Sequence, residues 1–478
     1  MDAVIVGATI VDGSGHEPVV GNVGILGERI VKVGTFDIPA SAHVIDGANQ
    51  VVAPGFIDSH THDDGYLLAH PDMLPKVSQG ITTVVTGNCG ISLAPLVNSQ
   101  VPQPLDLLGP PGLFCFKDFR SWIDALEKSP AAVNVVPLVG HTTLRVNVMD
   151  DTSRAATQEE CEAMQALLQE ALDAGAFGVS TGTFYPPAAH ATTNEIIEVC
   201  LPMKNRGGIY ATHLRDEADH IVPAIEEALE IGRATDSRVV FSHHKLAGEK
   251  NHGRSRETLK MISDAAALQP VCLDCHPYPA TSTMLRLDRV RIARRTMITW
   301  CTDYPEMAGR DFSDIMEEWN LDIEKTFERL GQAGAIYFLM DKGDVDRIFE
   351  FPLTMVGSDG LPFDSHPHPR QWGTFTNVLR TMVRERNLLA LPEAIHRMTG
   401  LAAANYGLQE RGLIKEGYFA DLVIFDPENV TDTATFEDPV NVSKGIASVW
   451  VNGRQVWDGQ KTGEVRPGKV LKPSLVPM

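Results

Sequence analysis

The stretch that decides the fold is the run Gly55-Phe56-Ile57-Asp58-Ser59-His60-Thr61-His62. Its apolar start is typical of a buried strand, and it ends with two histidines separated by one residue. Side chains alternate between the two faces of a strand, so we expect His60 and His62 to point the same way and share one ion. Neutral imidazole is a good ligand for zinc and similar divalent ions. The chain contains 16 histidines, so chance spacing is the alternative that the remaining sequence must exclude.

Composition is that of a large globular protein. The 478 residues are enough for one large domain and a smaller one. The hydrophobic content of 43% and the charged content of 22% are ordinary for a soluble fold. A net charge of −21 argues against nucleic acid and anionic membranes as partners, and an anionic substrate would have to be held by local cations.

Nothing in the sequence indicates export or membrane insertion. Met1–Val6 carries no basic residue, and no apolar stretch approaches a membrane-spanning length. The seven cysteines are odd in number and scattered, which does not suggest a disulfide framework. We therefore expect a cytoplasmic enzyme acting on a small molecule; the sequence leaves its oligomeric state open.

Short strands occur at both ends of the chain. In residues 1–54 two apolar runs flank Gly27-Glu28, a pattern typical of a two-residue hairpin turn. Strands return in residues 412–478, where Ala420–Asp426 is followed by Ser448–Val451 and a turn-forming Asn-Gly pair. We expect these two terminal segments to form one small β-sandwich.

Residues 55–411 read as alternating strands and helices. Apolar residues recur at helical spacing in segments such as Gln158–Ala174 and Ile221–Thr235. Eight such units predict an α/β fold of the (β/α)8 TIM-barrel class. The strand candidates are Gly55–His62, Thr82–Gly90, Asn134–His141, Ala176–Thr181, Gly208–His213, Arg238–Lys245, Val271–Tyr278 and Thr354–Gly360. A final helix is expected near Glu393–Tyr406.

The connection between the seventh and eighth strands is too long for a single helix. Residues 279–345 contain three segments of helical composition, Arg286–Trp300, Ser313–Trp319 and Glu324–Ala333. An insertion at this point lies on the carboxyl-terminal rim of a barrel, where it can cover the site as a lid.

Metal-binding residue types lie at the carboxyl end of several predicted strands, which is the face where barrel active sites are found. These residues are His60, His62, Cys89, His213, His243 and Asp359. The neighbouring His244 would face the opposite way on a strand, so we expect it to pack against a helix. The regular placement favours metal-dependent chemistry over chance.

At this point the chain resembles the amidohydrolase superfamily and, within it, the D-aminoacylases, which are N-acyl-D-amino-acid deacylases. The resemblance extends over essentially the whole length. The stretches that carry it are Gly55–Asp64, Thr86–Ser92, Tyr210–Glu217, Ser242–Lys245, Gly357–Gly360, His368–Arg370 and Gly417–Val423.

The resemblance implies a metal centre with two positions. Cys89, His213 and His243 would hold a tightly bound Zn2+, the tight position. A second, weaker position would be formed by His60, His62 and Asp359, with Cys89 as the bridge. Many amidohydrolases bridge two metals with a carboxylated lysine on the fourth strand, but Phe177–Gly182 offers no lysine here. By the same resemblance, Asp359 would be the general acid/base that transfers the proton of water to the departing amine.

The resemblance also implies substrate contacts. Arg370 matches the arginine that binds the α-carboxylate, and Ser282 matches a hydroxyl that assists it. Lys245 is two residues after His243, so on a strand its side chain points to the same face, and we expect it to reach the substrate. His276 stands where these enzymes usually have a tyrosine, which puts side-chain preference in doubt.

Other chemically suggestive residues have simpler explanations. Cys272 and Cys275 form a lone Cys-x-x-Cys in a core strand and are expected to be structural. For His141, His190 and His220 we expect packing or supporting roles.

The sequence therefore predicts zinc-dependent hydrolysis of N-acyl-D-amino acids to a carboxylate and a D-amino acid. Hydrolysis of a dipeptide or of a cyclic amide, as by a hydantoinase, is the close alternative. A non-catalytic scaffold that has lost its metal is disfavoured because all six ligand positions are filled. The sequence does not define the stereochemistry, the preferred side chain or acyl chain, or the number of metals in the working enzyme.

Overall fold

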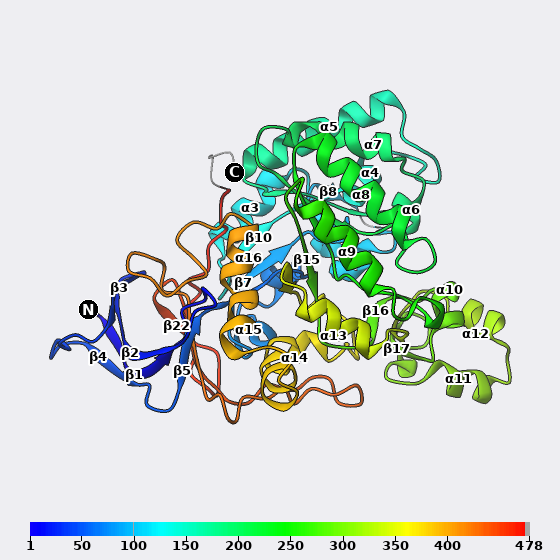
Figure 1. Ribbon diagram of the computed structural model, residues 1–478. Coiled ribbons are helices and arrows are strands. Elements are labelled where there is room, and N and C mark those ends of the chain that lie inside the picture. The colour runs from blue at the N-terminus through cyan, green and yellow to red at the C-terminus, as the bar shows by residue number, and fades with distance from the viewer. Residues whose placement is uncertain (99, 474–478) are drawn as a thin grey trace.

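A computed structural model describes residues 1–98 and 100–473 of the chain. Both ends of the described chain contribute to one eight-stranded sheet, seen on the left of Figure 1. Its order is β22-β21-β20-β5-β1-β2-β3, with β4 beside β1. The strands are β1 Ala3–Ile10, β2 Val19–Leu26, β3 Arg29–Gly34, β4 His43–Asp46, β5 Val51–Pro54, β20 Leu422–Phe425, β21 Ile446–Val451 and β22 Arg454–Trp457.

Tight turns in this sheet have the backbone geometry that their residues favour. Gly27, between β2 and β3, has φ +58°, and the Asn452-Gly453 pair between β21 and β22 has φ +47° and +74°. Positive φ is the requirement of such hairpins, and glycine and asparagine meet it with little strain. The two hairpin turns expected from sequence are therefore confirmed. β20 pairs antiparallel with β5 and joins the C-terminal strands to the N-terminal ones.

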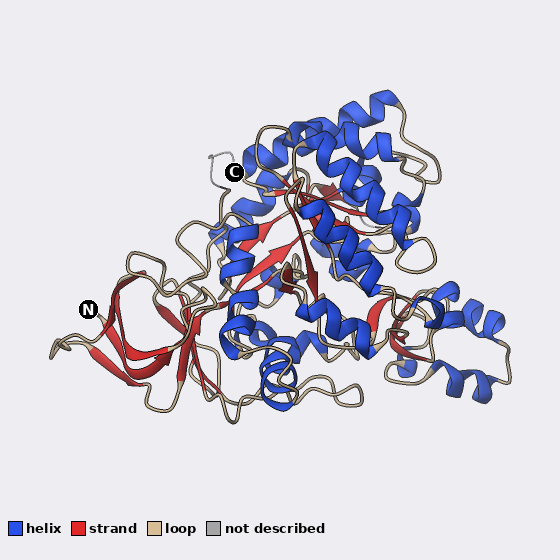
Figure 2. Cartoon of the chain, viewed as in Figure 1, coloured by secondary structure: helices blue, strands red, loops and turns tan. Residues whose placement is uncertain are grey.

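The centre of the molecule consists of parallel strands covered by helices (Figure 2). One sheet has the order β10-β7-β6 and the other the order β11-β12-β13-β14-β15-β19. Their bounds are β6 Phe56–Asp58, β7 Ile81–Thr86, β10 Asn134–Pro137, β11 Val139–Gly140, β12 Gly178–Gly182, β13 Ile209–His213, β14 Arg238–Phe241, β15 Val271–Cys275 and β19 Thr354–Val356. A short pair, β8 Leu96–Val97 and β9 Cys115–Phe116, lies apart from them.

Two helices begin and end where the sequence predicts. α5 spans Gln158–Ala174 and starts at a capping box between Thr157 and Glu160, and α8 spans Ile221–Thr235. Further helices are α1 Tyr66–Ala69, α2 Leu74–Val77, α3 Phe119–Lys128, α4 His141–Val148, α6 Pro186–Ala189, α7 Thr193–Cys200, α9 Ser255–Ala266, α13 Lys342–Glu350, α14 Arg370–Asn377, α15 Leu391–Met398 and α16 Gly400–Asn405. Within the described residues, no helix is both long enough and apolar enough to span a membrane.

Residues 281–338, between β15 and α13, form a separate antiparallel sheet with three helices, at the lower right of Figure 1. Its strands, in the order β16-β18-β17, are β16 Thr281–Met284, β17 Arg295–Cys301 and β18 Ala333–Phe338; its helices are α10 Leu287–Ile292, α11 Phe312–Trp319 and α12 Ile323–Leu330.

Two helix predictions in this segment are wrong in part. The helix expected over 286–300 stops at Ile292, because the β-branched and aromatic residues from 296 to 300 pair with β18 in a ladder. The helix expected over 324–333 ends at Leu330, before Gly331 at φ +62°.

Candidate metal centre

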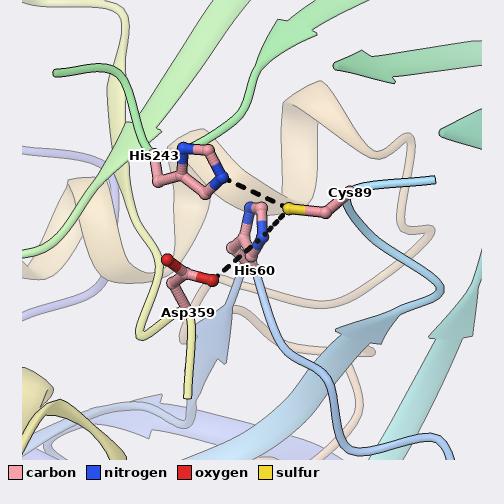
Figure 3. Close-up of side chains that lie close together, drawn as sticks. All are labelled: His60, Cys89, His243 and Asp359. Atoms are coloured by element: carbon pink, nitrogen blue, oxygen red, sulfur yellow. Dashed lines mark hydrogen bonds and ion pairs between the residues drawn. The ribbon is translucent and has the colours of Figure 1, made fainter. Parts of the chain in front are cut away.

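Four side chains meet beyond the carboxyl ends of the parallel strands. The ligand atoms of His60, Cys89, His243 and Asp359 all lie within 4.8 Å of one another. Figure 3 shows these side chains pointing toward a common centre. The Sγ of Cys89 is 3.2 Å from the Nε2 of His60 and 3.2 Å from the Nε2 of His243, while His60 Nε2 is 3.5 Å from Asp359 Oδ1.

Three of these residues have a left-handed backbone. Cys89, His243 and Asp359 lie two or three residues beyond β7, β14 and β19, with φ of +53°, +36° and +52°. Non-glycine residues seldom adopt this conformation, and where they do it is often at a functional site. Each chain segment therefore leaves its strand and turns its side chain into the same space.

The strand carrying the histidine pair is shorter than predicted. β6 ends at Asp58, so His60 and His62 lie in the following loop and the argument from strand alternation does not apply to them. They nevertheless converge, because His62 Nε2 lies 3.2 Å from Asp359 Oδ1. Asp274, at 3.3 Å from His60 Nδ1, orients the first ring. Burial lowers the pKa of His60 to about 3, which keeps the ring neutral.

His213 and Glu217 extend the cluster on its other side. Both ring nitrogens of His213 are buried and have no hydrogen-bond partner among the described residues. Glu217, which the sequence reasoning missed although it lies in a stretch that carries the resemblance, is 3.2 Å from the Nδ1 of His243. The Nε2 of that ring faces Cys89, so one ring joins the cluster to an outer carboxylate. Metal-binding histidines commonly have such a carboxylate partner on the second nitrogen.

The donor set fits zinc. Thiolate, imidazole and carboxylate are the ligands that Zn2+ takes in proteins. The buried Nδ1 of His213 has no partner among the described residues, and its Nε2 has only Glu217 Oε2, at 3.6 Å. Burial raises the pKa of the Cys89 thiol well above its ordinary value, and a coordinated cation would remove that proton.

Arg370 lies fully buried against Asp359, with its Nη1 2.7 Å from Asp359 Oδ2. Burial acts to raise the pKa of Asp359, but Arg370 and the neighbouring histidines hold it well below its ordinary value. Arg370 Nη2 donates to the carbonyl of Ser282 at 3.0 Å, and Nη1 is 3.1 Å from the Nε2 of His276. The structure thus brings three of the four predicted substrate-binding residues together beside Asp359.

His276 lies behind Arg370. Like Arg370, it is buried and does not line the pocket beside the four clustered side chains. Burial and the Arg370 guanidinium lower the pKa of His276 well below its ordinary value, so the ring is a neutral acceptor for the guanidinium N–H. This placement makes His276 a support for Arg370.

The pocket itself contains two further cations. Lys245 Nζ is 2.6 Å from His243 Nδ1 and also contacts Glu217. Arg289, which the sequence reasoning missed, enters from α10, with Nη2 3.9 Å from Glu217 and its guanidinium 4.5 Å from the centre of the Phe184 ring. Other lining residues include His62, Cys89, Tyr185, His213, Ser282, Thr283, Tyr337 and Asp359.

The remaining histidines and cysteines lie outside this pocket. His244 Nε2 is 2.9 Å from Thr258 Oγ1 on α9, which confirms that it packs against a helix. Cys272 and Cys275 are buried free thiols in β15. His141 is buried beside Glu195, at 3.5 Å, whereas His190 and His220 are exposed.

The chain matches known proteins over nearly its full length. Residues 43–457 match the model of the Amidohydrolase family. The N-acyl-D-aspartate deacylase of Alcaligenes xylosoxydans xylosoxydans is 72% identical over 473 residues, 99% of this chain and 95% of that protein.

Two solved structures show the same fold. A D-aminoacylase with a binuclear metal centre, for which one-metal activation and second-metal attenuation are described, has a TM-score of 0.96 and 54% identity over 98% of this chain and 99% of that one. The N-acyl-D-glutamate deacylase of Bordetella bronchiseptica, complexed with zinc and a phosphonate mimic of the tetrahedral intermediate, has a TM-score of 0.95 and 44% identity over 99% of both chains. The chain therefore belongs to the amidohydrolase family, within its group of D-aminoacylases.

Proposed function

We propose that this enzyme uses zinc to hydrolyse the amide bond of N-acyl-D-amino acids, and that N-acyl-D-aspartate is its preferred substrate. The products are a carboxylate and a free D-amino acid. Relatives with this type of activity and a metal centre support the reaction class. The observation that carries the proposal is one pocket in which Cys89, His213, His243 and Asp359 meet, with a buried arginine behind it.

Each metal position has its own protein ligands. Cys89, His213 and His243 would hold the tight zinc, and His60, His62 and Asp359 would form the second position with Cys89 shared between them. When bound, zinc supplies polarisation of the scissile carbonyl and lowers the pKa of water to about 7. Nε2 is the ring nitrogen of His243 that would bind the metal, since Nδ1 faces Glu217.

Asp359 is the proton-transfer group. Its Oδ2 is paired with Arg370, and its Oδ1 lies near both His60 and His62. The carboxylate is therefore ionised before substrate arrives and can accept a proton from the attacking water. It then donates this proton to the nitrogen of the departing amine, as general acid–base catalysis requires.

The α-carboxylate of the substrate would be bound by Arg370 with Ser282. A guanidinium holds a carboxylate with two parallel N–H bonds, which a single hydroxyl or ammonium cannot do. Ser282 lines the pocket, and its backbone carbonyl fixes Arg370 Nη2. Arg370, at the start of α14, is buried behind Asp359, and the Ser282 hydroxyl of β16 would be the partner that reaches the carboxylate from the pocket side.

Arg289 supports an acidic side chain as the preferred one. It is only 6% exposed, yet it lines the pocket, and its position between Phe184 and Glu217 leaves it close to the same space as Lys245. A second anion on the substrate would pair with a cation already desolvated there. N-acyl-D-glutamate is the second candidate, because the same cation can pair with its longer side chain and a relative acts on it.

A cyclic amide is a poorer fit to this pocket. A hydantoin-type substrate has no free α-carboxylate for Arg370 to bind. β12, the strand that would carry a bridging lysine, reads Gly178-Val179-Ser180-Thr181-Gly182. Cys89, between His60 and His243, has the bridging place instead.

We also infer that the two parallel sheets close into one (β/α)8 barrel spanning residues 55–411. A bridge from Thr61 to Gly360 and a hydrogen bond from Ser59 N to Val356 O, at 3.2 Å, join β6 to β19. Only Leu138 separates β10 from β11.

On this division, residues 1–54 and 412–478 are the second domain and 279–345 is the lid-like insertion. We place the enzyme in the cytoplasm, where the free thiol state of all seven cysteines is maintained.

The test is a panel of N-acetyl-D-aspartate, -glutamate, -methionine and N-acetyl-L-aspartate with zinc-loaded enzyme. We expect kcat/KM to be highest for the D-aspartate derivative. Arg289→Leu should lower kcat/KM for the acidic substrates by about 10–100-fold, the usual effect of losing a hydrogen-bonded charge pair. The matched control is Arg291→Leu, also on α10 but exposed and paired with Glu324. Equal activity on all side chains, or equal effects of both variants, would contradict the assignment of Arg289.

A further inference from the structure

A fully buried lysine lies beneath the metal-binding cluster, and the proposed chemistry does not use it. Lys76, on α2, has no exposed surface. Its Nζ is 2.9 Å from Asp58 Oδ2, 3.0 Å from Ser358 Oγ and 3.2 Å from Asp63 Oδ2. The ammonium donates hydrogen bonds to Asp58 and Ser358 and forms an ion pair with Asp63.

These three partners of Lys76 lie in the two chain segments that hold the ligands of the second metal position. Asp58 and Asp63 flank the loop that carries His60 and His62, and Ser358 directly precedes Asp359. The Lys76 ammonium therefore holds the loop of His60 and His62 to the segment of Asp359.

Two further hydrogen bonds, both donated by backbone N–H groups, join the same two segments. Asp58 Oδ1 accepts the N–H of Ser358 at 2.8 Å, and the N–H of Asp359 donates to the carbonyl of His60 at 2.8 Å. Asp58 makes both contacts at once, with Oδ2 paired to Lys76 and Oδ1 bonded to the loop of Ser358. Two buried carboxylates with no cation between them would repel each other and would have to take up protons or water.

We propose that Lys76 is a positioning residue for the second metal position: it sets the spacing between the His60–His62 loop and Asp359, and so sets the affinity of that position for a divalent cation. This inference rests on the ligand set given under the proposed function. It assigns no substrate contact and no proton transfer to Lys76.

The test measures metal binding rather than turnover alone, because the second metal attenuates activity in the related D-aminoacylase. Apo-enzyme is titrated with Zn2+, and the two binding events are followed by calorimetry and by metal content after dialysis. Cobalt substitution reports on Cys89 through its thiolate-to-metal absorption band. In Lys76→Met we expect the affinity of the second event to fall by about 10–100-fold, the usual effect of losing an outer partner of metal ligands. The first event and the cobalt–thiolate band should remain.

Two further variants separate positioning from general loss of stability. Lys76→Met combined with Asp63→Asn restores the net charge of the cluster but not the link to Ser358, so its second event should stay weak even if the single variant folds poorly. Arg411→Met is the matched control, because Arg411 is buried and pairs with Asp421 and Asn452 beside the terminal sheet. It should lower the unfolding temperature without changing either zinc affinity.

The inference is overturned by any of three results. These are native second-site affinity in both Lys76 variants, an equal loss in Arg411→Met, or a single binding event in the native enzyme. Wild-type enzyme that binds two zinc ions with the predicted Lys76 effect but does not hydrolyse N-acyl-D-amino acids would refute the proposed function and leave this inference standing.

Discussion

The two proposed metal positions have different surroundings. Around His60, His62 and Asp359, ion pairs and hydrogen bonds from Lys76, Asp274 and other buried groups restrain the segments that carry the side chains. These contacts hold the loop of His60 and His62 and the segment of Asp359 in place before a metal binds.

The tight position lies against the substrate pocket. His213 is stacked on Phe184, with ring centres 5.0 Å apart and planes at 15°, and its Nε2 lies 3.6 Å from Glu217 Oε2. His243 contacts Glu217 and Lys245 through Nδ1 and the Cys89 thiol through Nε2. The two sets therefore differ in their partners: Glu217 lies against both His213 and His243, whereas Lys76 joins the loop of His60 and His62 to the segment of Asp359. The following variants test that contrast.

Cys89→Ala should have the largest effect, because this thiol is 3.2 Å from a histidine of each position. We expect loss of tightly bound zinc and a fall of activity to background. Metal analysis together with turnover of N-acetyl-D-aspartate provides the measurement. Cys272→Ala, which removes an equally buried free thiol in β15, is the control and should keep its zinc. Full zinc content and activity in Cys89→Ala would show that Cys89 is not a ligand shared by the two metal positions.

Asp359→Asn tests whether Asp359, besides being a proposed ligand of the second position, transfers the proton in catalysis. The amide keeps the shape of the side chain but cannot accept the proton, so kcat should fall by about 10²–10⁴-fold. Zinc at the tight position should remain, as measured by metal content after dialysis. Near-normal turnover would transfer the role of base to another group, with His60 and His62 as the next candidates.

Arg370→Lys should raise KM by about 10–100-fold, because one ammonium cannot replace a two-pronged contact to a carboxylate. The control substrate is an N-acyl amine that lacks the α-carboxylate. It should be poor for the native enzyme and lose little more in the variant. Similar losses for both compounds would show that Arg370 supports the fold of this region and does not bind substrate.

His276→Phe should have the smallest effect, a rise in KM of about 5-fold, since it removes one hydrogen-bond acceptor behind Arg370. His276→Tyr should restore most of it, because a phenol oxygen can accept the same bond. The pKa of His276 is lowered well below its ordinary value by burial and by Arg370, so the ring stays neutral near pH 7. KM measured from pH 6 to 8 should therefore show the same profile in native and Tyr enzymes; an inflection lost in the variant would place a titrating His276 at the substrate.

Local sequence signals predicted the regular elements well. α5 begins at a capping box and ends at a left-handed glycine, so its bounds could be read from the residues themselves. The insertion was harder, because the strand at Arg295–Cys301 exists only through pairing with β18, whose sequence lies more than thirty residues further along.

The candidate site was likewise predictable from the sequence only in part. Cys89, His243 and Asp359 were identified from their place after strands and from family resemblance, but their left-handed backbone follows from tertiary packing that no local pattern reveals. Lys76 and Arg289 were missed for a related reason. Each lies on a short helix of ordinary composition, and only the folded chain shows that one reaches Asp58 and the other enters the pocket.

The insertion has a consequence for how this enzyme could acquire a new substrate range. Its antiparallel sheet is separate from the parallel strands, yet it contributes Ser282, Arg289 and Tyr337 to the pocket. The predicted metal ligands come from the end of β13, which carries His213, and from loops after other parallel strands. Recognition and chemistry are thus largely encoded in different stretches of the gene. Recombination within residues 281–338 could exchange specificity as a unit while the catalytic segments are inherited unchanged.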